Sequence, residues 1–105
     1  MALGMIECYG FTTSVIVADA VAKAGDVRIV ALDHNKPANA EKCAVPLVMI
    51  IKFEGSVAAV EAGLDAGVAV AKEKGLYITS RIISRQAEGT EKMAKLNIVG
   101  RDKLH

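Results

Sequence analysis

The sequence predicts an α+β domain in which a four-stranded antiparallel sheet carries two helices on one face and a short helix follows. Three observations predict this fold. Stretches with strand-like and helix-like apolar spacing follow one another in the order β-α-β-β-α-β. Gly25 and Gly75 stand where the two longer helices should end. A chain of 105 residues is long enough for one two-layer core and too short for two cores.

The first half of the chain contributes a strand, a helix and a second strand. Residues 3–9 predict a strand with apolar side chains on both faces, which is typical of a central strand covered twice. Cys8 is then a small buried hydrophobe. A helix is expected over residues 13–24, with Thr12 as its N-cap, and a strand over residues 27–32. The expected buried face of the helix has the spacing i, i+3, i+4, i+7: Val17, Ala20, Val21 and Ala24.

The second half repeats the pattern. Residues 47–54 form the most apolar strand, and a helix over residues 57–74 follows Ser56, its N-cap. A fourth strand is expected over residues 77–84. The chain then ends in a short helix and a tail that we expect to be poorly ordered, residues 90–96 and 97–105. This order is the split β-α-β arrangement of ferredoxin-like folds, which host many functions and decide none by themselves.

Composition excludes several function classes. The formal net charge is +1, so the sequence offers no electrostatic basis for binding nucleic acid or a membrane surface. Two cysteines, without a signal peptide or an apolar run of membrane-spanning length, indicate a soluble protein of a reducing cytoplasm. A disulfide between Cys8 and Cys43 is not expected. No phosphate-binding, nucleophile-elbow or paired-cysteine motif is present, so we expect no enzyme.

One segment differs from the rest of the chain. Residues 33–46 are polar and irregular, and they contain both prolines, Pro37 and Pro46. Loops of this length are uncommon in small domains, where they are usually functional or disordered. The segment also contains His34 and Cys43, which can bind metal. Because one histidine and one cysteine do not make a metal site, a solvated loop remains the simpler interpretation within a single chain.

Four motifs occur in a fixed order between residues 2 and 87. The first is Ala-Leu-Gly-Met-Ile-Glu at residues 2–7, followed by Gly-Phe at 10–11, and the second is Ala-Asp-Ala at 18–20, followed by Lys and Ala at 23–24. The third is Val-Glu-Ala-Gly-Leu-Asp-Ala-Gly at 60–67, and the fourth is Ile-Ile-Ser-Arg at 82–85. In order and spacing they resemble the single-domain shell proteins of bacterial microcompartments. The resemblance implies a shell domain over residues 2–87, with residues 88–105 forming a C-terminal helix and tail.

The resemblance also implies a structural function. Such proteins form flat cyclic hexamers that tile edge to edge into the wall of a protein-bounded organelle in the bacterial cytoplasm. The implied partners are further copies of this chain, other shell proteins and the encapsulated enzymes.

Two residues are implied at the edge between hexamers, Lys23 and Arg85. The family usually has Ile-Pro-Arg-Pro-His around this arginine. Here Ser84, Gln86 and Ala87 replace the two prolines and the histidine. The position of Arg85 matches the family, whereas its immediate surroundings depart from it.

The resemblance assigns the central pore to the connection between the second and third strands. That connection is normally a short turn rich in glycine and serine. Here, as residues 33–46, it is longer and carries Cys43, Ala44, Val45 and Pro46, which resembles a subgroup from glycyl-radical-type microcompartments that binds an iron–sulfur cluster at the pore. A ring would gather several copies of Cys43 around one axis. A [4Fe-4S] cluster takes at most four cysteines, so six loops could not all contribute equally.

Other functions remain open from the residues alone. A plain metabolite pore would be lined by backbone amides and by polar side chains of the loop, and Cys43 would be a bystander; the candidate lining residues are His34, Lys36, Glu41 and Lys42. A small-ligand regulatory module of ferredoxin-like fold is the next class. An enzyme with Cys43 as nucleophile comes last, because no base lies near it in the sequence.

Overall fold

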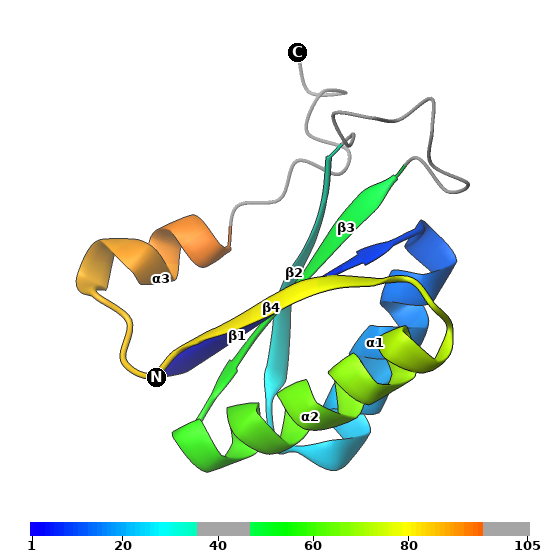
Figure 1. Ribbon diagram of the computed structural model, residues 1–105. Coiled ribbons are helices and arrows are strands. Elements are labelled where there is room, and N and C mark those ends of the chain that lie inside the picture. Colours follow the sequence, from blue (N-terminus) through cyan, green and yellow to red (C-terminus); the bar gives the residue numbers. More distant parts are fainter. Residues whose placement is uncertain (36–46, 96–105) are drawn as a thin grey trace.

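The computed structural model describes residues 1–35 and 47–95. Figure 1 shows the sheet with α1 and α2 packed on one face and α3 after the last strand. The strand order is β2-β3-β1-β4, and each neighbouring pair is antiparallel. The predicted ferredoxin-like α+β fold is confirmed. Its elements are β1 (Ala2–Tyr9), α1 (Phe11–Ala24), β2 (Arg28–Asn35), β3 (Val48–Gly55), α2 (Val57–Glu73), β4 (Tyr77–Ile83) and α3 (Glu88–Ala94).

The core lies between the sheet and the two long helices. Alternate residues of β1 and β3 meet the inner faces of α1 and α2. Glycines let the helices come close, since a Cβ on Gly67 would lie 2.6 Å from both Ile6 Cδ1 and Val21 Cγ2. The fully or nearly fully buried members of this core are Ala2, Ile6, Cys8, Val17, Val21, Met49, Ile51, Phe53, Val60 and Ala71.

Helix α1 begins two residues earlier than predicted. Its N-cap is Gly10, at φ 91°, and the structure shows no side-chain cap there, so the assignment of Thr12 as N-cap is wrong. The Gly10 carbonyl accepts the Ser14 N–H at 3.1 Å, and the Gly10 N–H donates to the Leu47 carbonyl at 2.7 Å. A glycine can adopt this positive φ without strain, so the helix begins at Phe11, one residue before Thr12.

The buried face of α1 was only partly predicted. Thr13, Ser14, Val17 and Val21 are buried, whereas Ala24 is exposed and Ala20 is half-buried. The stripe therefore follows a four-residue spacing from Thr13, and Ala24 falls off it. Helix α2 agrees better with prediction, because Ser56 Oγ accepts the Ala59 N–H at 3.1 Å, as an N-cap should.

Strand β2 is longer than predicted. It continues to Asn35, so Asp33, His34 and Asn35 belong to the strand and are not part of a loop. They pair with Ile50, Met49 and Val48 of β3. The apolar β3 supplies a complete partner for these residues, and this pairing outweighs their weak strand propensity. Of the predicted loop 33–46, residues 36–46 lie outside the described part of the chain.

The face of the sheet that carries no helices is less covered than the apolar pattern of β1 had predicted. On this face Leu3 is buried, but Met5 and Glu7 are only half-buried, and they border a depression of about 190 Å³. β1 is central as predicted, yet among the described residues it is closely covered on this side only at Leu3. Lys52 of β3 is almost buried here, and its Nζ lies 3.7 Å from Asp33 Oδ2.

The C-terminal helix is also displaced from its prediction. α3 begins and ends two residues earlier than the expected 90–96. The expected tail, residues 97–105, lies outside the described residues. No helix in the described ranges is long and apolar enough to cross a membrane.

Candidate functional site

The two ends of the sheet separate the two groups of candidate residues. At one end, Asn35 pairs with Val48, and residues 36–46 connect these two strands. At the other end, Arg28 pairs with Glu54, and Ile83 pairs with Leu3. The seven residue steps from Arg28 to Asn35 place these ends about 23 Å apart. Figure 1 shows the α1–β2 turn at the end of the sheet where β2 begins.

The end that joins residues 36–46 has an apolar groove. Phe11, His34, Leu47 and Met49 line a space of about 320 Å³. His34 is half-buried in β2, and its backbone N–H donates to Asp33 Oδ1 at 2.8 Å. The remaining pore candidates lie outside the described residues: Lys36, Glu41, Lys42, Cys43, Ala44, Val45 and Pro46.

The cysteine within the described residues is unsuited to bind metal. Cys8 is fully buried between the sheet and the helices, and burial raises the pKa of its thiol to about 11. A metal ligand must be a thiolate, which this environment disfavours. Residues 1–35 and 47–95 contain no group of three or more His, Cys, Asp or Glu side chains that could hold a metal ion. Cys8 is therefore poorly suited to ligate a cluster.

The first edge candidate, Lys23, is paired within its own helix. Its Nζ lies 2.8 Å from Asp19 Oδ2, an i, i+4 ion pair on the exposed side of the helix. The Lys23 side chain is 76% exposed. The hydrogen bond to Asp19 and the charge of that carboxylate raise the pKa of Lys23, so the ammonium stays protonated.

The second edge candidate, Arg85, is exposed directly after β4. Lys23 lies near the end of α1, just before β2 begins, and Arg85 follows the end of β4. These two predicted edge residues therefore lie toward the end of the sheet opposite the pair Asn35 and Val48, the described residues that flank the candidate pore segment.

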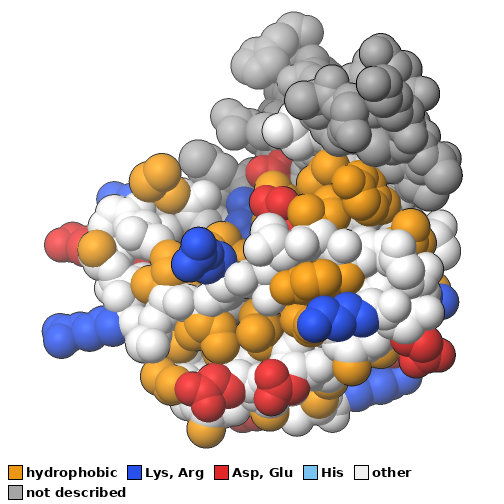
Figure 2. All heavy atoms as spheres, viewed as in Figure 1, with side chains coloured by type: hydrophobic (Ala, Val, Ile, Leu, Met, Phe, Trp, Pro, Cys, Tyr) orange, Lys and Arg blue, Asp and Glu red, His pale blue; other side chains and the backbone are white. Residues whose placement is uncertain are grey.

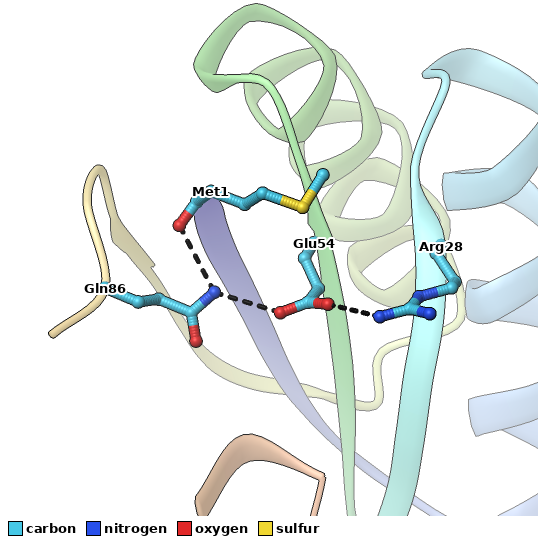
Figure 3. Close-up of polar contacts among 4 residues, drawn as sticks. All are labelled: Met1, Arg28, Glu54 and Gln86. Carbon is cyan, nitrogen blue, oxygen red and sulfur yellow. Dashed lines mark hydrogen bonds and ion pairs between the residues drawn. The ribbon is translucent and has the colours of Figure 1, made fainter. Parts of the chain in front are cut away.

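A polar network beside Arg85 was missed by the sequence analysis (Figure 3). Gln86 Nε2 donates to Glu54 Oε2 at 3.0 Å and to the Met1 carbonyl at 3.2 Å. Arg28 Nη2 donates to Glu54 Oε1 at 2.7 Å. Glu54 is 3% exposed and Gln86 is 8% exposed, so both polar side chains are held inside the protein.

The network lowers the pKa of Glu54. The hydrogen bond from Gln86 is the largest cause, and the hydrogen bond and charge of Arg28 and the charge of Lys95 act in the same direction against the effect of burial. Gln86 Oε1 has no hydrogen-bond partner among the described residues. The available sequence signal was an acidic residue at the end of an apolar strand, together with the replacement of the family's proline by Gln86.

The surface of α1 carries exposed apolar residues at the groove end. Phe11 is 50% exposed and Val15 is 46% exposed, and a spacing of four places them on one helix face. Ile16 beside them is also exposed. Figure 2 shows that the visible face of the molecule has hydrophobic patches between charged side chains.

Comparison with known proteins places this chain among shell proteins. The sequence model of the BMC domain matches residues 2–86. The shell protein PduA of Citrobacter freundii is 36% identical over 92 residues, which cover 88% of this chain and 89% of PduA. The shell protein EutK of Salmonella typhimurium is 36% identical over 90 residues, 86% of this chain and 49% of EutK. The chain thus spans nearly all of PduA but about half of EutK.

A solved structure agrees with these sequence matches. The crystal structure of a microcompartment protein from Desulfitobacterium hafniense superimposes with a TM-score of 0.71 and 26% identity, covering 87% of this chain and 47% of that one. The relatives are shell proteins, which confirms the prediction of a structural protein and not an enzyme. This chain belongs to the BMC-domain family, the shell proteins of bacterial microcompartments.

Proposed function

We propose that six copies of this chain form a ring that tiles into a microcompartment shell, with residues 36–46 at a central pore. The match of the BMC domain to residues 2–86 carries this proposal. The two-ended arrangement of the domain supports it. A ring needs one end of each protomer at its centre and the other at its rim. Asn35 and Val48, which flank the proposed pore segment, lie at the end of the sheet opposite the start of β2 and the end of β4, where Lys23 precedes β2 and Arg85 follows β4.

The exposed apolar residues of α1 support contact between copies. Phe11 and Val15 are about half exposed and lie at the same end as the groove lined by Leu47 and Met49. Contiguous apolar surface is rare on monomers and usually marks an interface. A second copy of this chain is the occupant that a shell protein requires. A head-to-tail contact that closes on itself gives a ring.

Light scattering of purified variants tests the ring. Phe11→Asp combined with Val15→Asp should convert the hexamer to monomers, because two carboxylates would be buried at the contact. Val57→Asp is the matched control, since Val57 is 40% exposed and opens α2 at the other end of the sheet. A monomeric wild-type protein would favour the small-ligand regulatory module. Hexamers that survive both α1 substitutions would place the contact elsewhere.

We further propose that copies of Cys43 from neighbouring chains hold one iron–sulfur cluster, [4Fe-4S], on the pore axis. Cys43 belongs to the segment at the pore end of the sheet, and Cys8 is buried in the core with a raised thiol pKa. When bound, such a cluster would supply one-electron transfer or redox sensing. The competing proposal is a metabolite pore lined by polar side chains such as Lys36 and Glu41.

Anaerobic reconstitution separates the two pore proposals. Cys43→Ser should lose the visible absorbance of the cluster together with its iron and sulfide, while the hexamer persists. Cys8→Ala should keep the visible absorbance, the iron and the sulfide. If Cys43→Ser retains full iron and sulfide, the cluster is held elsewhere or is adventitious, and the pore serves metabolites.

We also propose that the protein works in the microcompartment wall beside other shell proteins, with encapsulated enzymes on one side. Its near full-length similarity to PduA supports this placement. Coexpression with a second shell protein, followed by purification of intact shells, should recover this chain in the shells. Its absence from such shells would contradict the proposal.

A further inference from the structure

We infer that Gln86 is a positioning residue for Arg85: its buried amide, bonded to Glu54 and Met1, holds the segment that presents Arg85 to a neighbouring hexamer. This inference rests on the proposed function of Arg85 at the edge between hexamers. It assigns a second function to a buried amide that also pairs with the Glu54 carboxylate.

The Gln86 amide has one orientation that fits its surroundings. Both Nε2 hydrogens are used, one on Glu54 Oε2 at 3.0 Å and one on the Met1 carbonyl at 3.2 Å. A flipped amide would turn its oxygen toward a carboxylate and a carbonyl, and neither can donate. The backbone N–H of Gln86 also donates to the Met1 carbonyl, at 3.3 Å. Gln86 is therefore held by its main chain and its side chain together.

The network joins residues in or next to all four strands, at the end of the sheet where β2 begins and β4 ends (Figure 3). Met1 precedes β1, Arg28 begins β2, Glu54 lies in β3 and Gln86 follows β4. Each carboxylate oxygen of Glu54 accepts one donor, Oε1 from Arg28 and Oε2 from Gln86. A buried carboxylate satisfied on both oxygens is a rigid anchor, because losing either donor leaves a buried charge poorly paired.

Arg85 lies between two fixed points. On one side Ile83 ends β4 and pairs with Leu3; on the other, Gln86 is anchored to Glu54. The Arg85 side chain itself is exposed. Because the backbone of Arg85 is fixed, less conformational entropy is lost when its exposed guanidinium binds a partner. In the pattern usual for the family, prolines flank this arginine and fix φ covalently. Here the hydrogen bonds of Gln86 fix the same segment.

Gln86→Met is the first test, because methionine has a similar length and volume but donates no hydrogen bond. Hexamers should persist by light scattering. Hydrogen exchange of peptides covering residues 84–87 should become about tenfold faster or more, while exchange within β4 stays unchanged. The critical concentration for layer formation, followed by electron microscopy, should rise about tenfold.

A second variant separates positioning from stability. Gln86→Met alone leaves Glu54 Oε2 without its donor and lowers stability. Gln86→Met with Glu54→Met removes the buried charge as well, and Arg28, which is largely exposed, returns to water. This double variant should recover the melting temperature and still fail to form layers at the wild-type concentration. Recovery of layers along with stability would overturn the inference.

Arg85→Ala distinguishes failure of the inference from failure of the proposed function. If Arg85→Ala abolishes layers and Gln86→Met does not change them, Arg85 acts at the edge without help from Gln86. If Arg85→Ala itself leaves layers unchanged, the proposed edge function fails first. Loss of layers in both variants, with hexamers intact, is the expected result.

Discussion

Lys23 Nζ lies 2.8 Å from Asp19 Oδ2 on the exposed side of α1, so the residue expected to bridge hexamers already has an acceptor in its own chain. An exposed pair of this kind exchanges its partners easily, because water screens it. Lys23 can therefore leave Asp19 or share it with a neighbouring hexamer. The hydrogen bond and the charge of Asp19 raise the pKa of Lys23.

The first prediction concerns this lysine. Lys23→Glu should leave the hexamer intact and lower its melting temperature only slightly, since the side chain is exposed and its pair with Asp19 contributes little to the fold. The same substitution should abolish extended layers, because it would repeat a repulsive charge at every edge. Electron microscopy of matched concentrations gives the answer. Asp19→Ala is the control, and should keep layers because it leaves Lys23 free to bind the neighbour. Layers that persist in Lys23→Glu would make Lys23 an ordinary solvated residue.

The second prediction concerns pH. The pKa of Glu54 is lowered in the folded protein, first by the hydrogen bond from Gln86 and then by Arg28. A carboxylate with a depressed folded-state pKa contributes stability above its unfolded value, here 4.5, and loses it as pH falls through the folded value. The melting temperature of the wild type should exceed that of Glu54→Gln at pH 6, and the gap should narrow below about pH 4.5. A constant gap from pH 6 to pH 3 would show that ionised Glu54 contributes nothing.

The third prediction concerns helix packing. Gly67→Ala should destabilise the fold by about 1–3 kcal/mol, because its Cβ would press on Ile6 and Val21 inside the core. Gly89→Ala in α3 is the matched control. A Cβ there meets nothing within 4 Å, so the same change should be neutral or stabilise by about 0.4–1 kcal/mol. Urea unfolding of both variants measures the difference. Equal effects would mean that α2 can move away from the sheet without cost.

The sequence was informative where local pattern decides structure. Apolar periodicity and glycine stops predicted the type and order of every element, and Ser56 was identified correctly as a cap. The exposure of Lys23 and Arg85 and the burial of Cys8 followed from the same patterns and from the family resemblance. These features depend on residues close together in the chain.

The sequence was less informative where distant residues decide structure. Strand β2 runs on through Asp33 to Asn35 because β3 lies beside it, which local propensity does not show. The bond between Gln86 and Glu54 joins residues 32 positions apart and depends on strand register. A polar side chain in an apolar strand signals such a pair, but it does not say which partner the fold will bring.

The proposed shell function requires that this protein close into a ring of six, with residues 36–46 at its centre. Native mass spectrometry of the purified wild-type protein tests it most directly, because it counts the chains of 11.0 kDa in each particle. We expect a dominant particle of six chains, which the paired substitution of Phe11 and Val15 by aspartate should convert to single chains. A dominant monomer or dimer of the wild type at micromolar concentration would contradict it.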